Sequence, residues 1–178
     1  MSKSALIVVD MINAYDFPDA EKLLPSAEQA VPVIREMIEN ADGPVIYVND
    51  NFGHWRSNRD ELVDEALSSD HGDLVEPIRP RDESLFVVKA RHSIFYQTPL
   101  EYLLAQEEVE QVTLTGQVTE QCILYSALDA YIRHLDVRVP PDAVAHIYDD
   151  LAEAALRMME RNMSANLTPA RDRGYTRR

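Results

Sequence analysis

The chain has 178 residues, 46% of them hydrophobic, which is enough for one domain with a full core and too few for two. Its 31 acidic and 17 basic residues leave a net charge of −14, which argues against nucleic acid or an anionic membrane surface as a partner. The one cysteine excludes an internal disulfide framework and fits a reducing compartment, so we expect a cytoplasmic protein without a membrane span.

The first part of the chain predicts two strands that are covered on both faces. Residues 5–9 and 45–48 are continuous apolar runs rich in β-branched side chains, as strands of parallel sheets are. Between them, apolar residues at helical spacing predict a helix that opens at Pro25 and is delayed or kinked at Pro32.

The rest of the chain continues this alternation. The further strands we expect are residues 85–88, 111–115, 137–139 and, with a weaker pattern, 164–167. The further helices we expect are residues 59–68, 98–106, 119–135 and 149–163, with a loop over 69–83. This order predicts a single α/β domain: an open, mostly parallel, five- to six-stranded sheet with helices on both faces, a Rossmann-like three-layer sandwich. We place its end at residue 167 and expect residues 168–178 to form a mobile tail.

Three residues with complementary chemistry follow strands of this sheet. Asp10 comes directly after the first strand, Lys89 after the third, and Cys122 in the turn after the fourth. Functional groups of an open parallel sheet gather at the carboxyl ends of its strands, so we expect all three at one edge. The start of a helix and a nearby lysine both favour a thiolate over a thiol at Cys122, which predicts rapid alkylation at neutral pH. Taken singly, each residue also fits an ordinary structural role: a cap, a solvent-reaching lysine and a small core residue.

Several short motifs follow one another from about residue 4 to residue 167. They are Ala5-Leu-Ile-Val-Val-Asp-Met-Ile-Asn13, Val45-Ile-Tyr-Val-Asn-Asp50, Val87-Val-Lys89 with Ser93, Phe95, Thr98 and Leu100, Leu114-Thr-Gly-Gln-Val-Thr-Glu-Gln-Cys122 with Ala127, Asp129 and Ala130, and Pro141-Asp-Ala143. This ordered set resembles the isochorismatase-like cysteine hydrolases, which include nicotinamidases, N-carbamoylsarcosine amidases, ureidoacrylate amidases and isochorismatases.

The resemblance implies a catalytic triad of Asp10, Lys89 and Cys122. It also implies a non-proline cis peptide bond between Val118 and Thr119, with the N–H groups of Thr119 and Cys122 facing an oxyanion. The reaction it implies is hydrolysis of a C–N amide bond of a small molecule through a thioester, with Asp10 as general acid and base and Lys89 as its electrostatic partner. Relatives are commonly dimers or larger assemblies, so a homo-oligomer is expected.

The chain departs from the nicotinamidase pattern after the second strand. Nicotinamidases usually carry Asp-x-His there, plus a further His, and hold a metal, whereas this chain reads Asn49-Asp-Asn-Phe-Gly-His54. Asp50, His54 and His71 remain as candidate ligands, but we expect no metal and no other cofactor. Gln117 stands where relatives often have an apolar residue, and the sequence assigns it no role.

Loop residues supply candidates for the wall of a substrate pocket. They are Tyr15, Phe17, Asn51, Trp55 and Phe95. Trp55 fits surface packing or a subunit contact equally well. His92 follows Lys89 closely enough to reach the site, although a solvent-facing loop position is the simpler expectation.

Two other functions stay open at this stage. Isochorismatases cleave a vinyl ether without a cysteine nucleophile, a reaction for which Asp10 and Lys89 would suffice. The other is a non-catalytic protein that binds a small ligand or supports an assembly on the same fold.

Overall fold

The computed structural model describes residues 3–55 and 58–173 of the chain. Its strands are β1 (Lys3–Val9), β2 (Val45–Asp50), β3 (Leu85–Lys89), β4 (Val109–Gln117), β5 (Asp136–Arg138) and β6 (Val144–Ala145). Its α-helices are α1 (Ala20–Glu39), α2 (Arg59–Leu67), α3 (Gly72–Val75), α4 (Leu100–Gln106), α5 (Leu124–Ile132) and α6 (Asp149–Met163). A single π turn, Thr119–Ile123, leads from β4 into α5.

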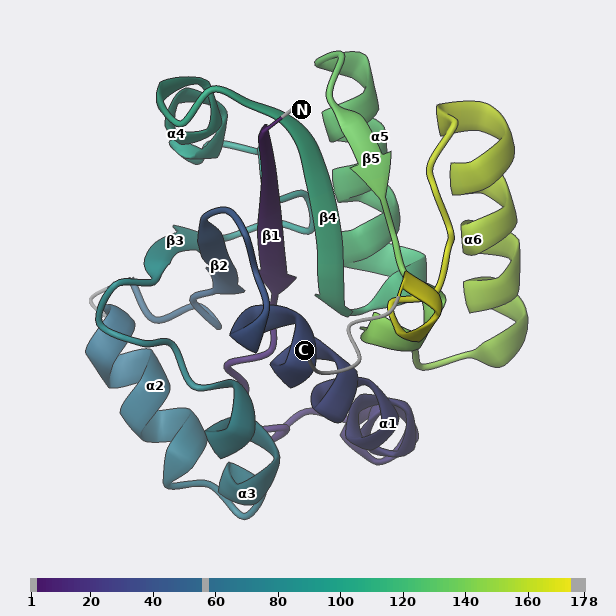
Figure 1. The fold of residues 1–178 in the computed structure, drawn as a ribbon. Coiled ribbons are helices and arrows are strands. Elements are labelled where there is room, and N and C mark those ends of the chain that lie inside the picture. Colours follow the sequence, from purple (N-terminus) through teal and green to yellow (C-terminus); the bar gives the residue numbers. More distant parts are fainter. Residues whose placement is uncertain (1–2, 56–57, 174–178) are drawn as a thin grey trace.

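The strands form one parallel sheet with β1 near its middle. The order is β3-β2-β1-β4-β5, and β6 pairs with the end of β4 (Figure 1). In register, Val9 lies beside Val48 on one side and Gly116 on the other, while Asp50 lies beside Lys89. The carboxyl ends of four strands therefore meet at one edge of the sheet.

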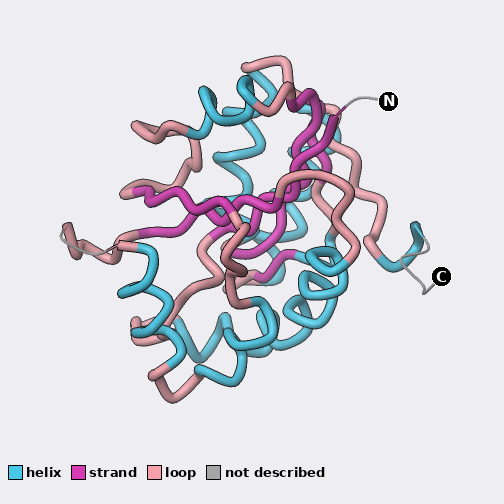
Figure 2. The backbone as a smooth tube through the Cα atoms, turned by 60° about the vertical axis from the view of Figure 1, so that its left-hand side comes forward, coloured by secondary structure: helices cyan, strands magenta, loops and turns pink. Residues whose placement is uncertain are grey.

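Helices cover both faces of the sheet, as Figures 1 and 2 show. Successive residues of β1 point to opposite faces, so Ile7 and Val9 belong to one buried cluster and Leu6 and Val8 to the other. The first cluster includes residues of α4, α5 and α6, and the second includes residues of α1, α2 and α3. This arrangement confirms the predicted α/β sandwich and explains why the inner strands lack polar alternation.

A predicted helix and a predicted loop differ from the structure. Helix α1 begins at Ala20, before the expected start, and holds both Pro25 and Pro32 inside it. Its long buried face, which includes Leu23, Ala27 and Ile34, stabilises a helix that its prolines alone would disfavour. The loop predicted over 69–83 contains α3 and a further helical turn at Glu76–Ile78.

The sixth strand was assigned to the wrong segment. The structure forms it from Val144–Ala145, whereas the predicted segment 164–167 makes one bridge, from Asn166 to Arg138. Such short strands depend on what lies beside them rather than on their own pattern.

The packed part of the chain also extends past the predicted boundary at residue 167. Ala170 is buried, and the N–H groups of Ala170 and Arg171 donate to the carboxylate of Asp142 at 2.8 and 3.2 Å. The rest of the predicted tail, residues 174–178, lies outside the described residues.

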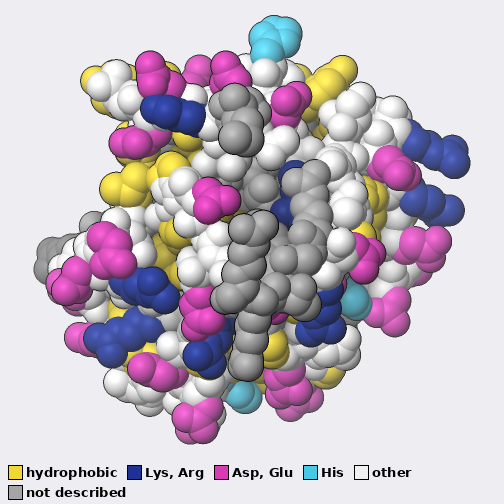
Figure 3. Space-filling view, in the orientation of Figure 1, with side chains coloured by type: hydrophobic (Ala, Val, Ile, Leu, Met, Phe, Trp, Pro, Cys, Tyr) yellow, Lys and Arg dark blue, Asp and Glu magenta, His cyan; other side chains and the backbone are white. Residues whose placement is uncertain are grey.

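The surface carries the excess of acidic residues. Acidic side chains are scattered over the face shown in Figure 3, between smaller numbers of basic ones. Among the described helices, none is long and apolar enough to cross a bilayer.

Candidate active site

The structure brings Asp10, Lys89 and Cys122 together at the carboxyl edge of the sheet. The ammonium nitrogen of Lys89 lies 2.8 Å from Oδ2 of Asp10 and 3.6 Å from Sγ of Cys122. All three side chains are buried, Lys89 at 2% exposure. The three residues that the sequence places after separate strands thus form one cluster.

Asp10 is held from both neighbouring strands. Its backbone N–H donates to the carbonyl of Val48 at 3.0 Å, and its Oδ1 accepts the N–H of Asp50 at 2.8 Å. On the other side, Nε2 of Gln117 donates to the Asp10 carbonyl at 2.8 Å. Asp10 itself has a φ of +54°, a left-handed conformation that residues with side chains adopt rarely.

Cys122 lies in the π turn between β4 and α5. The carbonyl of Val118 accepts N–H groups from Gln121 and Ile123, which closes the turn around the cysteine. The N–H of Val118 faces the sulfur and lowers the pKa of Cys122. A π turn is a frequent feature of functional sites because it displaces one residue out of the regular helical spacing.

The cis peptide bond lies one position earlier than predicted. It joins Gln117 to Val118, so the expected bond between Val118 and Thr119 was wrong. Neither bond precedes a proline, so the residue types alone do not distinguish the two positions. The hydroxyl of Thr119 donates to the carbonyl of Ala145 at 2.9 Å, so this buried residue fastens the turn to β6.

The electrostatics of the cluster oppose a resting thiolate. Burial raises the pKa of Cys122, and the Asp10 carboxylate raises it further, against a smaller opposite effect of Lys89. Burial likewise raises the pKa of Asp10, although Lys89 partly offsets it. Burial lowers the pKa of Lys89, but Asp10, Cys122 and Asp50 together raise it above its ordinary value. The cluster therefore keeps a charged lysine and holds the cysteine as a thiol, contrary to the expectation from the helix start.

Two further side chains reach the cluster. Oδ2 of Asp50 lies 3.7 Å from the Lys89 nitrogen, and Nδ1 of His92 lies 3.6 Å from the cysteine sulfur. His92 is exposed, and the centre of its ring lies 5.6 Å from the centre of the Tyr125 ring. In the sequence, only its place three residues after Lys89 indicates that His92 could reach the site. A solvent-facing position is the simpler expectation, but the structure places its ring next to the cysteine sulfur.

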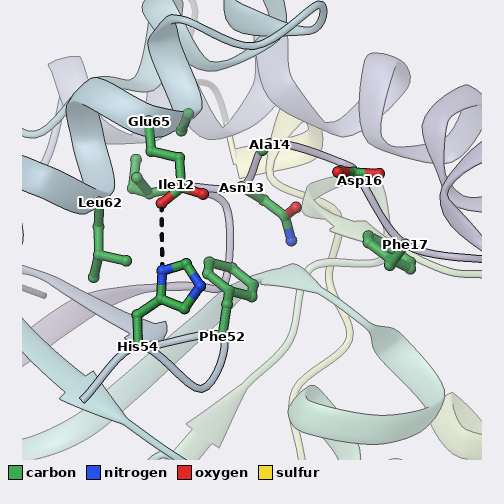
Figure 4. A pocket seen from close by; sticks show the side chains of 10 residues that line it. Ile12, Asn13, Ala14, Asp16, Phe17, Phe52, His54, Leu62 and Glu65 are labelled. Carbon is green, nitrogen blue, oxygen red and sulfur yellow. Dashed lines mark ion pairs between the residues drawn. The ribbon is translucent and has the colours of Figure 1, made fainter. Parts of the chain in front are cut away.

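A cavity of about 260 Å³ opens between the loops after β1 and β2 and helix α2 (Figure 4). The aromatic rings of Phe17 and Phe52 form part of its wall. His54 and Glu65 also line it, with Nδ1 of His54 3.9 Å from Oε2 of Glu65. The residues that line the cavity begin two residues after Asp10 on one loop, at Ile12, and two residues after Asp50 on the other, at Phe52.

Of the five predicted pocket residues, only Phe17 lines this cavity. Tyr15 is buried and hydrogen-bonded to Gln117, and Asn51 accepts the N–H of Gly53 and so shapes its own loop. Phe95 belongs to the core, below the guanidinium of Arg133 at 4.8 Å from the ring centre. Trp55 exposes 78% of its surface, because it lies at the tip of a loop with little to pack against.

The three candidate metal ligands face different partners. Asp50 points to Lys89, His54 to Glu65, and His71 to the edge of the Tyr15 ring at 5.9 Å. Within residues 3–55 and 58–173, no three His, Cys, Asp or Glu side chains are grouped so that they could hold a metal ion.

The chain is similar to known proteins over nearly its whole length. A family model described as the Isochorismatase domain matches residues 4–172. The uncharacterised isochorismatase family protein YaaI of Bacillus subtilis is 36% identical over 173 residues, which cover 94% of this chain and 96% of that protein.

Solved structures show the same fold. A nicotinamidase from Staphylococcus aureus superposes with a TM-score of 0.73 at 26% identity, covering 94% of this chain and 100% of the other. An N-carbamoylsarcosine amidase from Thermoplasma acidophilum superposes with a TM-score of 0.72 at 27% identity, covering 94% and 96%.

Proposed function

The chain belongs to the isochorismatase family and is a hydrolase of that family, and we propose that it cleaves a C–N amide bond of a small molecule with Cys122 as its nucleophile. The observation that carries this proposal is the buried contact of one ammonium group with both a carboxylate and a thiol. Vinyl ether cleavage would leave the thiol without a part in the reaction. The named structural relatives, a nicotinamidase and an N-carbamoylsarcosine amidase, are also amide hydrolases.

In the first half of the reaction, the thiol proton of Cys122 passes to the Asp10 carboxylate as Sγ attacks the carbonyl carbon. A carbon–sulfur bond forms, and the carbonyl oxygen becomes an oxyanion. When the carbon–nitrogen bond breaks, Asp10 returns its proton to the departing amine, which leaves a thioester. The pKa values of both groups are raised by burial, so each holds a proton more readily than it would in water.

In the second half, Asp10 takes a proton from water as the water oxygen attacks the thioester. The carbon–sulfur bond then breaks, and the sulfur regains a proton from Asp10, which releases the acid and restores the enzyme. Lys89 stays charged throughout and stabilises whichever of its two neighbours is negative.

Backbone donors of the turn would stabilise the oxyanion. Since the Val118 N–H faces the cysteine sulfur, we propose Val118 and Cys122 as the two donors and give Thr119 a structural role instead. Such a donor is commonly worth about 3–4 kcal/mol of transition-state stabilisation.

The test is an intact-mass screen of amides, ureides and carbamoyl compounds. Because Cys122 is the only cysteine, a thioester adduct on the wild type that is absent from Cys122→Ala would identify the nucleophile. We expect Cys122→Ala and Asp10→Ala each to lose turnover by at least about a thousandfold. If Cys122→Ala keeps most activity while Asp10→Ala loses it, ether hydrolysis replaces amide hydrolysis as the function.

We further propose a cytoplasmic homo-oligomer that needs no metal or other cofactor. The single cysteine supports a reducing compartment, which cell fractionation would check. The separate partners of Asp50, His54 and His71 support a metal-free site, which unchanged turnover after dialysis against a chelator would check.

A further inference from the structure

Gln117 is buried at the catalytic edge, yet the proposed mechanism gives it no part. Its side chain is 1% exposed, and both of its polar ends are occupied. Nε2 donates to the backbone carbonyl of Asp10 at 2.8 Å, and Oε1 accepts the hydroxyl of Tyr15 at 3.2 Å. Tyr15 is itself buried, so the chain of bonds lies away from solvent, where an unpaired polar group is costly.

The backbone of Gln117 leads directly to the nucleophile. Gln117 is the last residue of β4, and the next N–H group, that of Val118, faces the sulfur of Cys122. The side chain of Gln117 therefore reaches the acid–base group while its backbone continues into the turn that carries the thiol.

Asp10 needs such support because of its conformation. Asp10 follows Val9, which lies beside Gly116 in the sheet. Gln117 follows Gly116, so it lies next to Asp10. The φ of Asp10, +54°, is sparsely populated and persists where surrounding bonds hold it. The hydrogen bonds from Gln117 and Asp50 hold its carbonyl and carboxylate from opposite sides.

We propose that Gln117 is a positioning residue: it fixes the backbone of Asp10 through the Asp10 carbonyl, is itself oriented by Tyr15, and so keeps the Asp10 carboxylate in reach of the Cys122 thiol. This inference rests on the proposed function, in which Asp10 and Cys122 exchange a proton.

The test compares Gln117→Met, which keeps the length of the side chain, with the matched control Thr115→Val. Thr115 is also buried on β4 and donates to a carbonyl of β1, that of Ile7 at 2.9 Å, but it does not contact Asp10. Each variant therefore loses a buried hydrogen bond from β4 to a backbone carbonyl of the neighbouring segment. Only Gln117→Met loses the hydrogen bond to the carbonyl of Asp10.

The first measurement is the rate of alkylation of Cys122 by iodoacetamide against pH. The Asp10 carboxylate raises the pKa of Cys122, so a displaced Asp10 should lower that pKa and increase the alkylation rate at a given pH. Lys89, His92 and Asp50, the other charged or titratable groups at the cluster, are unchanged in each variant. At a given pH we expect faster alkylation than in the wild type for Gln117→Met, a smaller increase for Tyr15→Phe, and the wild-type rate for Thr115→Val.

A wild-type alkylation rate in Gln117→Met, or an equal increase in Thr115→Val, would overturn the proposal; Tyr15→Phe decides if Gln117→Met does not fold. With a substrate, Gln117→Met should lower kcat about ten- to hundredfold and change KM less. Alkylation needs no substrate, so it tests the positioning role even if the wild type hydrolyses no amide, a result that would contradict the proposed function alone.

Discussion

The state of the Cys122 sulfur depends on its immediate neighbours rather than on the helix that follows it. A helix start favours a thiolate by a fraction of a unit charge, whereas a carboxylate in contact brings a full one into a buried site. The one positive charge of Lys89 is already balanced by the carboxylate of Asp10, so it does not also balance a thiolate at Cys122. In the proposed mechanism, the resting enzyme therefore holds a thiol whose proton Asp10 removes when a substrate arrives.

Removing the charge of Asp10 should separate reactivity from turnover. In Asp10→Asn, the group that raises the pKa of Cys122 is gone and the lowering effect of Lys89 remains. The thiolate fraction at pH 7 should rise, so iodoacetamide should react faster than with the wild type, while turnover falls because no base is left.

The measurement is the second-order alkylation rate from pH 6 to 10. Since only the thiolate reacts, the wild-type rate should be low at pH 7 and still climb above the pH at which an ordinary thiol levels off. Equal rates for the two proteins at pH 7 would show that Asp10 does not control the sulfur.

At the scale of elements, the site depends on how closely β1 approaches β4. Gly116 has a φ of +104°, and a Cβ atom there would lie 2.2 Å from the carbonyl oxygen of Val9, the residue before Asp10. Only glycine combines this conformation with this contact. The sequence shows Gly116 as the end of a strand pattern, but the contact across the sheet is visible only in the structure.

Gly116→Ala should therefore cost more stability than a glycine substitution that strains the backbone alone. Gly53 is the matched control, because it also has a positive φ, +80°, but no atom of the described residues lies within 4 Å of its added Cβ. We expect Gly53→Ala to cost about 1 kcal/mol from strain, and Gly116→Ala to cost about 1–3 kcal/mol more from overpacking. Urea midpoints measure both, and equal costs would contradict the close approach.

At the scale of the whole molecule, an exposed apolar stripe on α5 supports the proposed assembly. Tyr125, Leu128 and Ile132 recur at helical spacing and are 46%, 45% and 56% exposed. Tyr125 also packs against His92, so a second copy on this stripe would lie close to Cys122, the proposed nucleophile. The net charge of −14 opposes contact between identical copies, and salt screens that repulsion.

Leu128→Glu should convert the assembly to monomers by placing a charge in its apolar contact. The control is Tyr102→Glu, at an exposed residue of α4 that is not part of the stripe, which should leave the mass unchanged. Light scattering at two salt concentrations measures both, with tighter association of the wild type expected at the higher one. A wild type that is monomeric under all conditions would sink the proposal.

The fold class and the three residues of the cluster at the edge of the sheet could be predicted from the sequence alone. Apolar runs such as Ala5–Val9 can be satisfied only inside a covered sheet, and in such a sheet residues that directly follow strands share one edge. These inferences need only neighbours along the chain and the general handedness of βαβ units.

Tertiary structure alone decided what depends on contacts between distant segments. The pairing of Val144–Ala145 with β4, the bond of Gln117 to Asp10 and the contact of His92 with Cys122 join residues that no local pattern connects. The charge state of Cys122 belongs to the same class, because a pKa in a buried site is determined by the groups in contact with it. The position of Cys122 after a strand predicts the edge of the sheet on which it lies, whereas the contacts made by the fold determine its orientation and its charge.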